Sequence, residues 1–245
     1  MEKGLLMGAI AFFAVFIAYF VKGVAGFANT LIFSGIMNYF TTNITISPIE
    51  LLLGAPSNVL MICKNRKLIS AKVVVPISIC MIAGMIPGTF FLKVGDDRLL
   101  KIILGVVVIA LGVEMLMRLR ANKQAKASWL FMVFIGVLSG VLIGIFGIGA
   151  FLVAYISRTS PDTNAFKGNL SCVFFVDNVF RTILYSVTGI LTKTVLLNAL
   201  MLAPMMLAGF GCGMLVSKYL PEKTVKLIVI ILLIVNGVSL IAMSL

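Results

Sequence analysis

The chain lacks histidine altogether and carries few charged residues of either sign. Histidine is the usual general base, a common metal ligand and the side chain that titrates near neutral pH. Its absence excludes a Ser–His dyad and a helical zinc-protease motif. Only 11% of the 245 residues are charged, whereas 61% are hydrophobic; soluble domains carry about 25% charged residues. This composition excludes a water-soluble enzyme, a disordered chain and a disulfide scaffold, and it predicts that most of the surface lies in lipid.

Cysteine and acidic residues are also scarce. The four cysteines (Cys63, Cys80, Cys172 and Cys212) all lie within apolar runs and form no CxxC pair, so we expect small buried side chains rather than ligands. No metal and no cofactor is predicted. The chain has 20 basic against 8 acidic residues and a net charge of +12. On so apolar a chain, this excess indicates basic loops at a membrane surface, not binding to nucleic acid.

Long apolar runs dominate the sequence. A helix needs about 20 apolar residues to cross a bilayer, and in lipid it satisfies its own backbone. Runs of this kind cover 45–63, 70–92, 99–117, 166–189, 195–217 and 224–244. Two further stretches, 4–40 and 129–157, are too long for one helix and short for two, and glycines interrupt both. Each is predicted to be either a re-entrant hairpin or a pair of crossings. No signal-peptide cleavage site is evident after the first run, which we interpret as a retained membrane segment.

The distribution of basic residues predicts how the chain is oriented. Two clusters flank the runs 70–92 and 99–117, and they consist of Lys64, Arg66, Lys67 and Lys72, and of Arg118, Arg120, Lys123 and Lys126. Basic loops face the cytoplasm. We therefore predict a multi-pass protein of the cell inner (plasma) membrane with its N- and C-termini outside.

The two halves of the sequence resemble each other. The segment Ala83–Gly88 matches Ala208–Gly213, and the register continues through matched charges, since Lys93 meets Lys218. Upstream, Gly23–Gly26 meets Gly144–Gly147. Chance similarity between apolar sequences does not readily explain glycines and charges that match at one fixed offset. The sequence thus contains an internal repeat.

Each half has an odd number of crossings, so the two copies would run in opposite directions through the membrane. We therefore predict an all-α polytopic membrane protein with two inverted-topology repeats, the plan of many secondary transporters. Each repeat has a broken or re-entrant opening hairpin plus three transmembrane helices. Repeat 1 covers 1–117, a basic cytoplasmic linker covers 118–128, and repeat 2 covers 129–245.

The two glycine-rich interruptions are the predicted binding region. Interrupted helices hold the sites of many transporters, and the half-helix after a break presents N–H groups that suit an anion. The residues concerned are Gly23, Gly26, Gly144, Gly147 and Gly149. Close helix packing is the alternative, and we favour it for the GxxxG pairs Gly84/Gly88 and Gly209/Gly213 and for the ladder Gly136, Gly140 and Gly144.

Charged residues within apolar runs are costly and usually functional. Lys22 and Arg181 are predicted to attract an anionic substrate. Asp177 is predicted to be the only acidic residue deep in an apolar run, and it is our candidate for proton coupling. Two alternatives stay open: Asp177 and Arg181 lie four residues apart and could neutralise each other, and Lys22 could extend to the membrane surface.

Neutral polar residues complete the predicted substrate-binding set. Asn58 and Asn178 occupy matching positions in the two halves and are predicted hydrogen-bond donors from facing helices. Further polar contacts are expected from Asn29, Thr30, Asn169 and Ser171.

The order and duplication of the glycine-rich segments 140–149, 84–88 and 209–213 resemble the sulfite exporter TauE/SafE family of membrane permeases. The resemblance spans nearly the whole chain. It implies transport of small anions such as sulfite, sulfoacetate or related sulfonates. The first break departs from the family pattern, because Ala28 and Asn29 stand where glycines are expected and Lys22 precedes it.

The leading hypothesis is a secondary transporter, exporter or permease, that moves small anions by alternating access. The alternatives are an anion channel and a non-transporting scaffold subunit of a membrane complex. An intramembrane enzyme is disfavoured, since no catalytic constellation is present, and without a Walker A sequence we expect no ATP hydrolysis. The expected partners are a small anion and the lipid bilayer; the sequence leaves open whether the chain forms a homo-oligomer.

Overall fold

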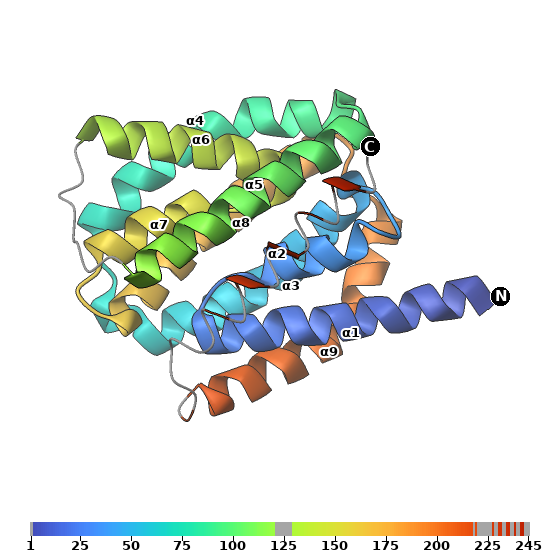
Figure 1. Ribbon diagram of the computed structural model, residues 1–245, viewed down its shortest axis with the longest axis horizontal. Helices are drawn as coiled ribbons and strands as arrows, with labels where there is room; N and C mark the ends of the chain where they lie inside the picture. Colours follow the sequence, from blue (N-terminus) through green and yellow to red (C-terminus); the bar gives the residue numbers. More distant parts are fainter. Residues whose placement is uncertain are drawn as a thin grey trace. The chain divides into compact units, whose positions relative to one another are not determined.

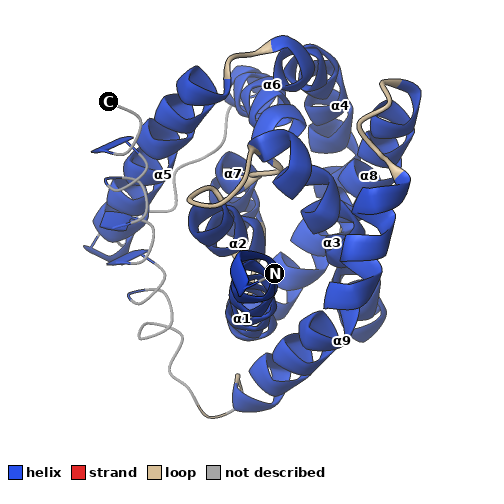
Figure 2. Ribbon diagram, turned by 90° about the vertical axis from the view of Figure 1, so that its right-hand side faces the viewer, coloured by secondary structure: helices blue, strands red, loops and turns tan. Residues whose placement is uncertain are grey.

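The computed structural model describes residues 2–120 and 129–217 and a few isolated positions after them (219, 227, 230, 231, 234, 235, 238, 241 and 242). All regular secondary structure of the described residues is helical, as Figure 2 shows. The predicted all-α class is confirmed. The linker segment 121–128, Lys218 and most of the predicted crossing 224–244 lie outside the described residues.

The helices follow the predicted runs closely (Figure 1). They are α1 (Glu2–Ala25), α2 (Asn29–Met37), α3 (Asn43–Asn65), the short 3-10 helix η1 (Arg66–Leu68), α4 (Ala71–Val94), α5 (Asp97–Arg120), α6 (Trp129–Phe146), α7 (Ala150–Thr159), α8 (Thr163–Val187) and α9 (Lys193–Val216). Within the part of the chain that the structure describes, six segments are long and apolar enough to cross a membrane: Met7–Ala25, Asn43–Leu68, Ala71–Val94, Trp129–Phe146, Thr163–Val187 and Lys193–Val216.

Both interrupted stretches consist of a long helix, a break and a short helix. The first joins α1, of 24 residues, to α2, of 9. The second joins α6, of 18 residues, to α7, of 10. At 1.5 Å per residue the short helices are only about 13–15 Å long, roughly half of a bilayer core of about 30 Å. Each short helix packs back onto the long helix that precedes it. The predicted breaks are therefore confirmed, and each separates a crossing helix from a half-helix.

The described helices form two compact units, and each unit takes helices from both sequence halves. Unit 1 contains residues 1–50, 95–122 and 194–245, and unit 2 contains residues 51–94 and 123–193. The compact units thus do not coincide with the predicted repeats at 1–117 and 129–245. Those repeats stay a prediction from the sequence.

In unit 1, α1 and α9 pack so closely that their backbones touch. A Cβ atom placed on Gly209 would collide with the carbonyl of Phe16, and one on Gly213 would collide with the carbonyl of Phe20. In return, a Cβ on Gly23 would lie 2.8 Å from the backbone nitrogen of Met214. Glycine is required at these positions because any side chain would push the two helices apart.

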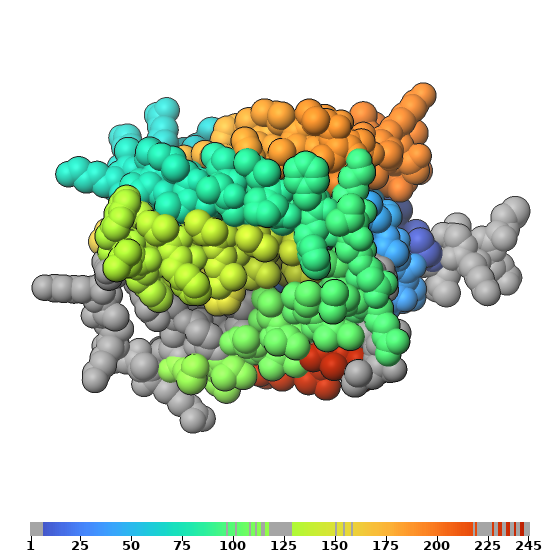
Figure 3. Space-filling view, turned by 90° about the horizontal axis from the view of Figure 1, so that it is seen from above, coloured from blue at the N-terminus to red at the C-terminus, as the bar shows by residue number. Residues whose placement is uncertain are grey.

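In unit 2, α4 and α6 make a contact of the same kind. A Cβ atom on Gly84 would collide with the carbonyl of Val137, and one on Gly88 with the carbonyl of Val141. From the other side, a Cβ on Gly144 would lie 2.7 Å from the carbonyl oxygen of Met85. Figure 3 shows the teal atoms of α4 directly against the yellow-green atoms of α6 along their length.

These two helix pairs correspond residue by residue. The sequence aligns Gly84 with Gly209 and Gly144 with Gly23. The first glycine of each pair makes in unit 2 the contact that the second makes in unit 1. In each unit, the opening helix of one half packs against the GxxxG helix of the other. The packing role predicted for the GxxxG pairs is confirmed, and the shared geometry supports the internal repeat.

The cysteines differ from the prediction. Cys63 and Cys212 are exposed, and Cys80 and Cys172 are half-buried, all four as free thiols. The expectation of burial was wrong, because an apolar run in a membrane helix marks faces that meet lipid as well as faces that meet protein.

Candidate functional site

The first break begins where α1 ends in a left-handed glycine. Gly26 has a φ of 87°, and its N–H donates to the carbonyl of Lys22 at 2.7 Å. Ala28 also has a positive φ, of 75°, immediately before α2. The N–H of Ile32 then donates to the carbonyl of Ala28 at 3.1 Å, which starts the half-helix. Left-handed residues of this kind end a helix abruptly and redirect the chain.

The second break has the same hydrogen-bond pattern and the same left-handed first glycine, but Gly149 before α7 has a φ of −100° where Ala28 has 75°. Gly147 has a φ of 72°, and its N–H donates to the carbonyl of Ile143 at 2.8 Å. The N–H of Val153 donates to the carbonyl of Gly149 at 3.1 Å, which starts α7. Neither half-helix is capped by a side chain at its N-terminus, and neither has an acidic residue in its first turn. Both N-termini therefore keep the positive dipole end that suits an anion.

At the first break, Lys22 is buried in the last turn of α1. Its side chain is 2% exposed, and its ammonium lies 5.7 Å from the centre of the Tyr19 ring. A lysine that extended to the membrane surface would be far more exposed. The structure therefore contradicts that alternative, and the cation stays beside the break.

A carboxylate that our sequence analysis missed lies in the same region. Glu50 of α3 is 3% exposed, and Asn29, the first residue of α2, donates from its Nδ2 to Glu50 Oε1 at 2.6 Å. The hydroxyl of Tyr19 donates to the main-chain carbonyl of Glu50 at 3.4 Å. Thr30 is buried beside Asn29, with its Oγ1 3.5 Å from Asn29 Nδ2. We call Tyr19, Lys22, Asn29, Thr30 and Glu50 the unit 1 cluster.

The expectation that Asp177 is the only acidic residue deep in an apolar run was therefore wrong. Glu50 lies inside the predicted crossing 45–63, close to its start, and our sequence analysis did not consider it. Its position about two turns into α3, against α1 and α2, buries it. The glutamate is visible in the sequence, but how deeply its carboxylate is buried depends on the neighbouring helices.

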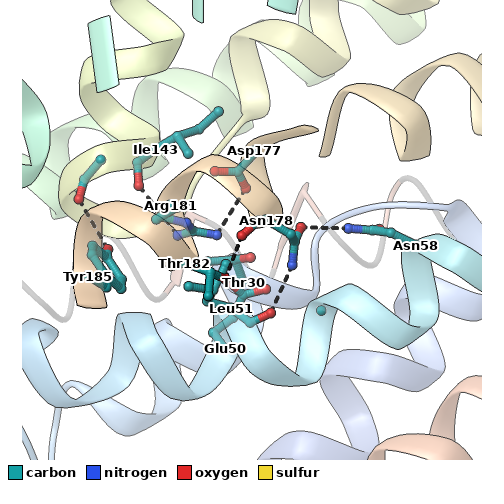
Figure 4. Close-up of polar contacts among 12 residues, drawn as sticks. Thr30, Glu50, Leu51, Asn58, Ile143, Asp177, Asn178, Arg181, Thr182 and Tyr185 are labelled. Carbon is teal, nitrogen blue, oxygen red and sulfur yellow. Dashed lines mark hydrogen bonds and ion pairs between the residues drawn. The ribbon is translucent and has the colours of Figure 1, made fainter. Parts of the chain in front are cut away.

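At the second break, the charged residues lie on α8 (Figure 4). Arg181 is 2% exposed and donates from Nη2 to Asp177 Oδ2 at 3.0 Å. It also points Nη1 at the carbonyl of Ile143, at 3.4 Å, on the last turn of α6. Tyr185 donates its hydroxyl to the carbonyl of Gly144 at 3.2 Å. These interactions tie α8 to the end of the interrupted helix, and they confirm that Asp177 and Arg181 pair.

The predicted asparagine pair of α3 and α8 is present in unit 2. Asn58 donates from Nδ2 to Asn178 Oδ1 at 3.0 Å, and Asn178 donates in turn to the carbonyl of Leu51 at 2.8 Å (Figure 4). Asn58 and Asn178 are 2% and 4% exposed. Asn58 Oδ1 is buried with no hydrogen-bond partner. The matched asparagines therefore join the two helices and keep one buried acceptor.

Asn169 and Ser171 lie at a distance from these groups. On α8 they precede Arg181 by 12 and 10 residues, which corresponds to about 18 and 15 Å along a helix. Asn169 accepts from the N–H of Ser70 at 2.7 Å and donates to Ser160 Oγ at 3.2 Å, so it fixes the start of α4. Ser171 is buried, and its hydroxyl has no hydrogen-bond partner.

The glycines of the breaks divide into two kinds. Gly26 and Gly147 turn the chain, as their positive φ values show. Gly23 and Gly144 make the helix contacts described above, and Gly149 lies so close to the ring of Phe174 that a Cβ would collide with it. Close approach of a ligand to these last three remains a prediction, because helix packing already accounts for their lack of a side chain.

The comparisons with known proteins place the chain in a family. The family model described as sulfite exporter TauE/SafE matches residues 11–240. The chain belongs to the sulfite exporter TauE/SafE family. It matches none of the curated proteins and none of the solved structures with which it was compared.

Membership of the TauE/SafE family supports three parts of the interpretation. It is a family of membrane permeases and not of enzymes, which agrees with the six apolar helices. The chain is thus a multi-pass membrane protein of a transport family. The match covers both breaks and the buried charged residues beside them, Lys22, Glu50, Asp177 and Arg181.

Proposed function

We propose that this TauE/SafE protein is a secondary transporter, exporter or permease, that moves sulfite, sulfonates or related small organic anions across the plasma membrane by alternating access. The observation that carries the proposal is the burial of a cation at each break, Lys22 in unit 1 and Arg181 in unit 2, each 2% exposed. Buried cations in membrane helices are costly and mark substrate or ion pathways.

Each break offers an anion two kinds of partner. The uncapped half-helix supplies backbone N–H groups. The neighbouring cation supplies charge, and a guanidinium can bind two oxygens of a sulfonate or carboxylate through parallel hydrogen bonds. Asn29, Thr30, Asn58 and Asn178 would add neutral polar contacts. This combination suits a small oxyanion better than a neutral or cationic solute.

The matched backbone of the two breaks supports alternating access. Inverted repeats allow a transporter to exchange the conformations of its two halves. The paired glycine contacts and the identical hydrogen-bonding pattern of the breaks are what such a duplication would produce. The outside location of both termini belongs to the same proposal, as does proton coupling through a buried carboxylate, for which Asp177 is the candidate from the sequence.

Transport by purified protein in proteoliposomes tests the function. The panel is sulfite, sulfoacetate, taurine, thiosulfate and simple carboxylates, with thermal unfolding in detergent as a first screen, since a ligand stabilises the folded state according to its occupancy. Saturable counterflow supports a carrier. Single-channel current supports the channel alternative, and no flux or binding for any anion supports the scaffold alternative.

Variants of the two cations assign the site. Lys22→Gln should weaken anion binding about tenfold to a hundredfold, because a hydrogen bond to a charged group contributes about 1.5–3 kcal/mol. The double variant Asp177→Asn/Arg181→Gln should have an effect of the same size, and it removes the second cation without leaving the carboxylate of Asp177 unpaired. Arg66→Gln and Lys67→Gln remove the same charges from exposed positions and serve as matched controls. Unchanged transport in Lys22→Gln and in the double variant would remove both cations from the proposed site.

A further inference from the structure

The charges around the breaks do not favour an anion as they stand. In unit 1, the buried cation Lys22 shares its cluster with the buried carboxylate of Glu50. In unit 2, Arg181 is paired with Asp177 at 3.0 Å. Among the described residues, each break thus has one buried cation and one buried carboxylate near it, Lys22 and Glu50 in unit 1 and Arg181 and Asp177 in unit 2. An anion that enters either region meets a negative charge that competes with it for the cation, so neutralising a carboxylate strengthens binding of the anion.

Resting on the proposed function, we infer that Glu50 is the residue that takes up a proton when the anion binds, and that the protein is a proton–anion symporter. A proton added to the carboxylate of Glu50 changes the unit 1 cluster from neutral to a net charge of one positive. A bound monoanion then restores neutrality. Proton and anion therefore favour each other's binding, and this coupling is reciprocal.

The hydrogen bond from Asn29 survives neutralisation of Glu50. Asn29 Nδ2 donates to Oε1 at 2.6 Å. A carboxylic acid protonated on Oε2 keeps its carbonyl oxygen as an acceptor, so this bond persists in both protonation states. Asp177 has a structural role instead, because its ion pair with Arg181, which also reaches the carbonyl of Ile143, ties α8 to the end of α6, and protonating Asp177 would weaken that link.

The groups around Glu50 include two residues of α1. The hydroxyl of Tyr19 donates to the main chain of Glu50, and the ammonium of Lys22 lies over the Tyr19 ring. The half-helix α2 carries no titratable side chain. Asn29 is its first residue, directly after the break, so the carboxyl group is bonded to the half-helix whose N-terminus would hold the anion.

The inference also sets the direction of net flux. In symport, a proton gradient alone drives the anion toward the alkaline side, about tenfold in concentration for each pH unit when one proton moves with one monoanion. An outward anion gradient of sufficient size still allows export. The direction is therefore the sum of two gradients and not a fixed property of the chain.

Proteoliposomes loaded with an alkaline buffer and diluted into an acidic one test the inference. Labelled methanesulfonate is the main probe because its charge is constant near neutral pH, and labelled sulfite is the comparison. The wild type should accumulate anion inside. Glu50→Gln should exchange anion at equal pH at a rate that no longer depends on pH, while its accumulation ratio in the gradient falls to about one. Asp96→Asn, which neutralises an exposed carboxylate, is the matched control and should behave as wild type.

Two further measurements keep the outcome decisive. Size-exclusion elution and thermal unfolding show whether Glu50→Gln is folded, and Glu50→Asp should restore gradient-driven accumulation. A pH-sensitive dye inside wild-type vesicles should report proton entry together with the anion, which requires no variant.

The outcomes separate the two proposals. Exchange of no anion in the panel would overturn the transport function, and the Glu50 inference with it. Intact exchange with undiminished accumulation in Glu50→Gln, anion movement toward the acidic side, or wild-type flux without proton movement would each overturn the role of Glu50 alone. Loss of both exchange and accumulation in folded Glu50→Gln would make Glu50 a substrate-binding residue and would likewise overturn the coupling role.

Discussion

The two breaks have a similar backbone turn but differ in the arrangement of their charged side chains. Gly26 and Gly147 turn the chain with φ values of 87° and 72°. At the first break, Lys22 is on α1 and Glu50 is on α3. Asn29, the first residue of the half-helix α2, donates a hydrogen bond to the carboxylate of Glu50. At the second, Asp177 and Arg181 both lie on α8.

This difference shows that one backbone arrangement, a long helix that ends at a break before a half-helix, carries different side-chain chemistry in the two units. The second break holds a local ion pair that anchors α8 to α6, and the first holds a carboxylate whose hydrogen bond is compatible with either protonation state.

The largest effect is expected from breaking the ion pair of the second break. Arg181→Gln should destabilise the protein by about 3–5 kcal/mol, because it leaves the carboxylate of Asp177 buried without its partner. The double variant Asp177→Asn/Arg181→Gln should recover most of that loss. Chemical unfolding of purified protein in detergent measures both. A loss below about 1 kcal/mol in the single variant would mean that the pair is not a structural anchor and that the two breaks are more alike than we infer.

An intermediate effect tests whether the helix pairs of the two units are equivalent. Gly84→Ala and Gly209→Ala should each cost about 1–3 kcal/mol, because the new methyl group would meet a backbone carbonyl that cannot move far. The two costs should agree within a factor of about two, as expected of duplicated contacts, and thermal unfolding compares them.

Gly211→Ala supplies the control on α9. A Cβ at Gly211 would have no atom within 4 Å. The substitution should be neutral or stabilise by up to about 1 kcal/mol through helix propensity. A loss at Gly211 equal to that at Gly209 would show that the costs come from the helix backbone and not from the contact between helices.

The smallest effect concerns the left-handed residues of the breaks. Gly26→Ala and Gly147→Ala should each cost about 1–2 kcal/mol, because an L side chain disfavours the positive φ of these positions. Thermal unfolding of each variant gives the comparison. Costs near zero would show that the turn can relax and that glycine serves another purpose there.

Ala28 offers the reverse change. It already holds a φ of 75° with a side chain, so Ala28→Gly should relieve strain. The greater freedom of glycine in the unfolded chain offsets part of the gain, and the net stabilisation should not exceed about 1 kcal/mol. Destabilisation would indicate that the methyl group of Ala28, which is buried, packs against a required surface.

The sequence by itself determined the helices, because runs of about 20 apolar residues have few other structures in lipid. It determined the breaks too, since glycines at matching positions allow backbone angles that other residues avoid. Helical periodicity allowed an i to i+4 pair of Asp177 and Arg181, but the sequence left this pairing as one of two alternatives.

Only the tertiary structure decided which polar groups meet. The bond between Asn29 and Glu50 joins residues of two helices, and the burial of Glu50 depends on α1 and α2 around it. The exchange of helix partners between the two halves is likewise invisible in either half alone. The hydropathy of a residue shows whether it suits an apolar environment. It does not distinguish lipid from the protein interior, because both are apolar. The neighbour that satisfies a buried charge is therefore fixed only when the helices pack.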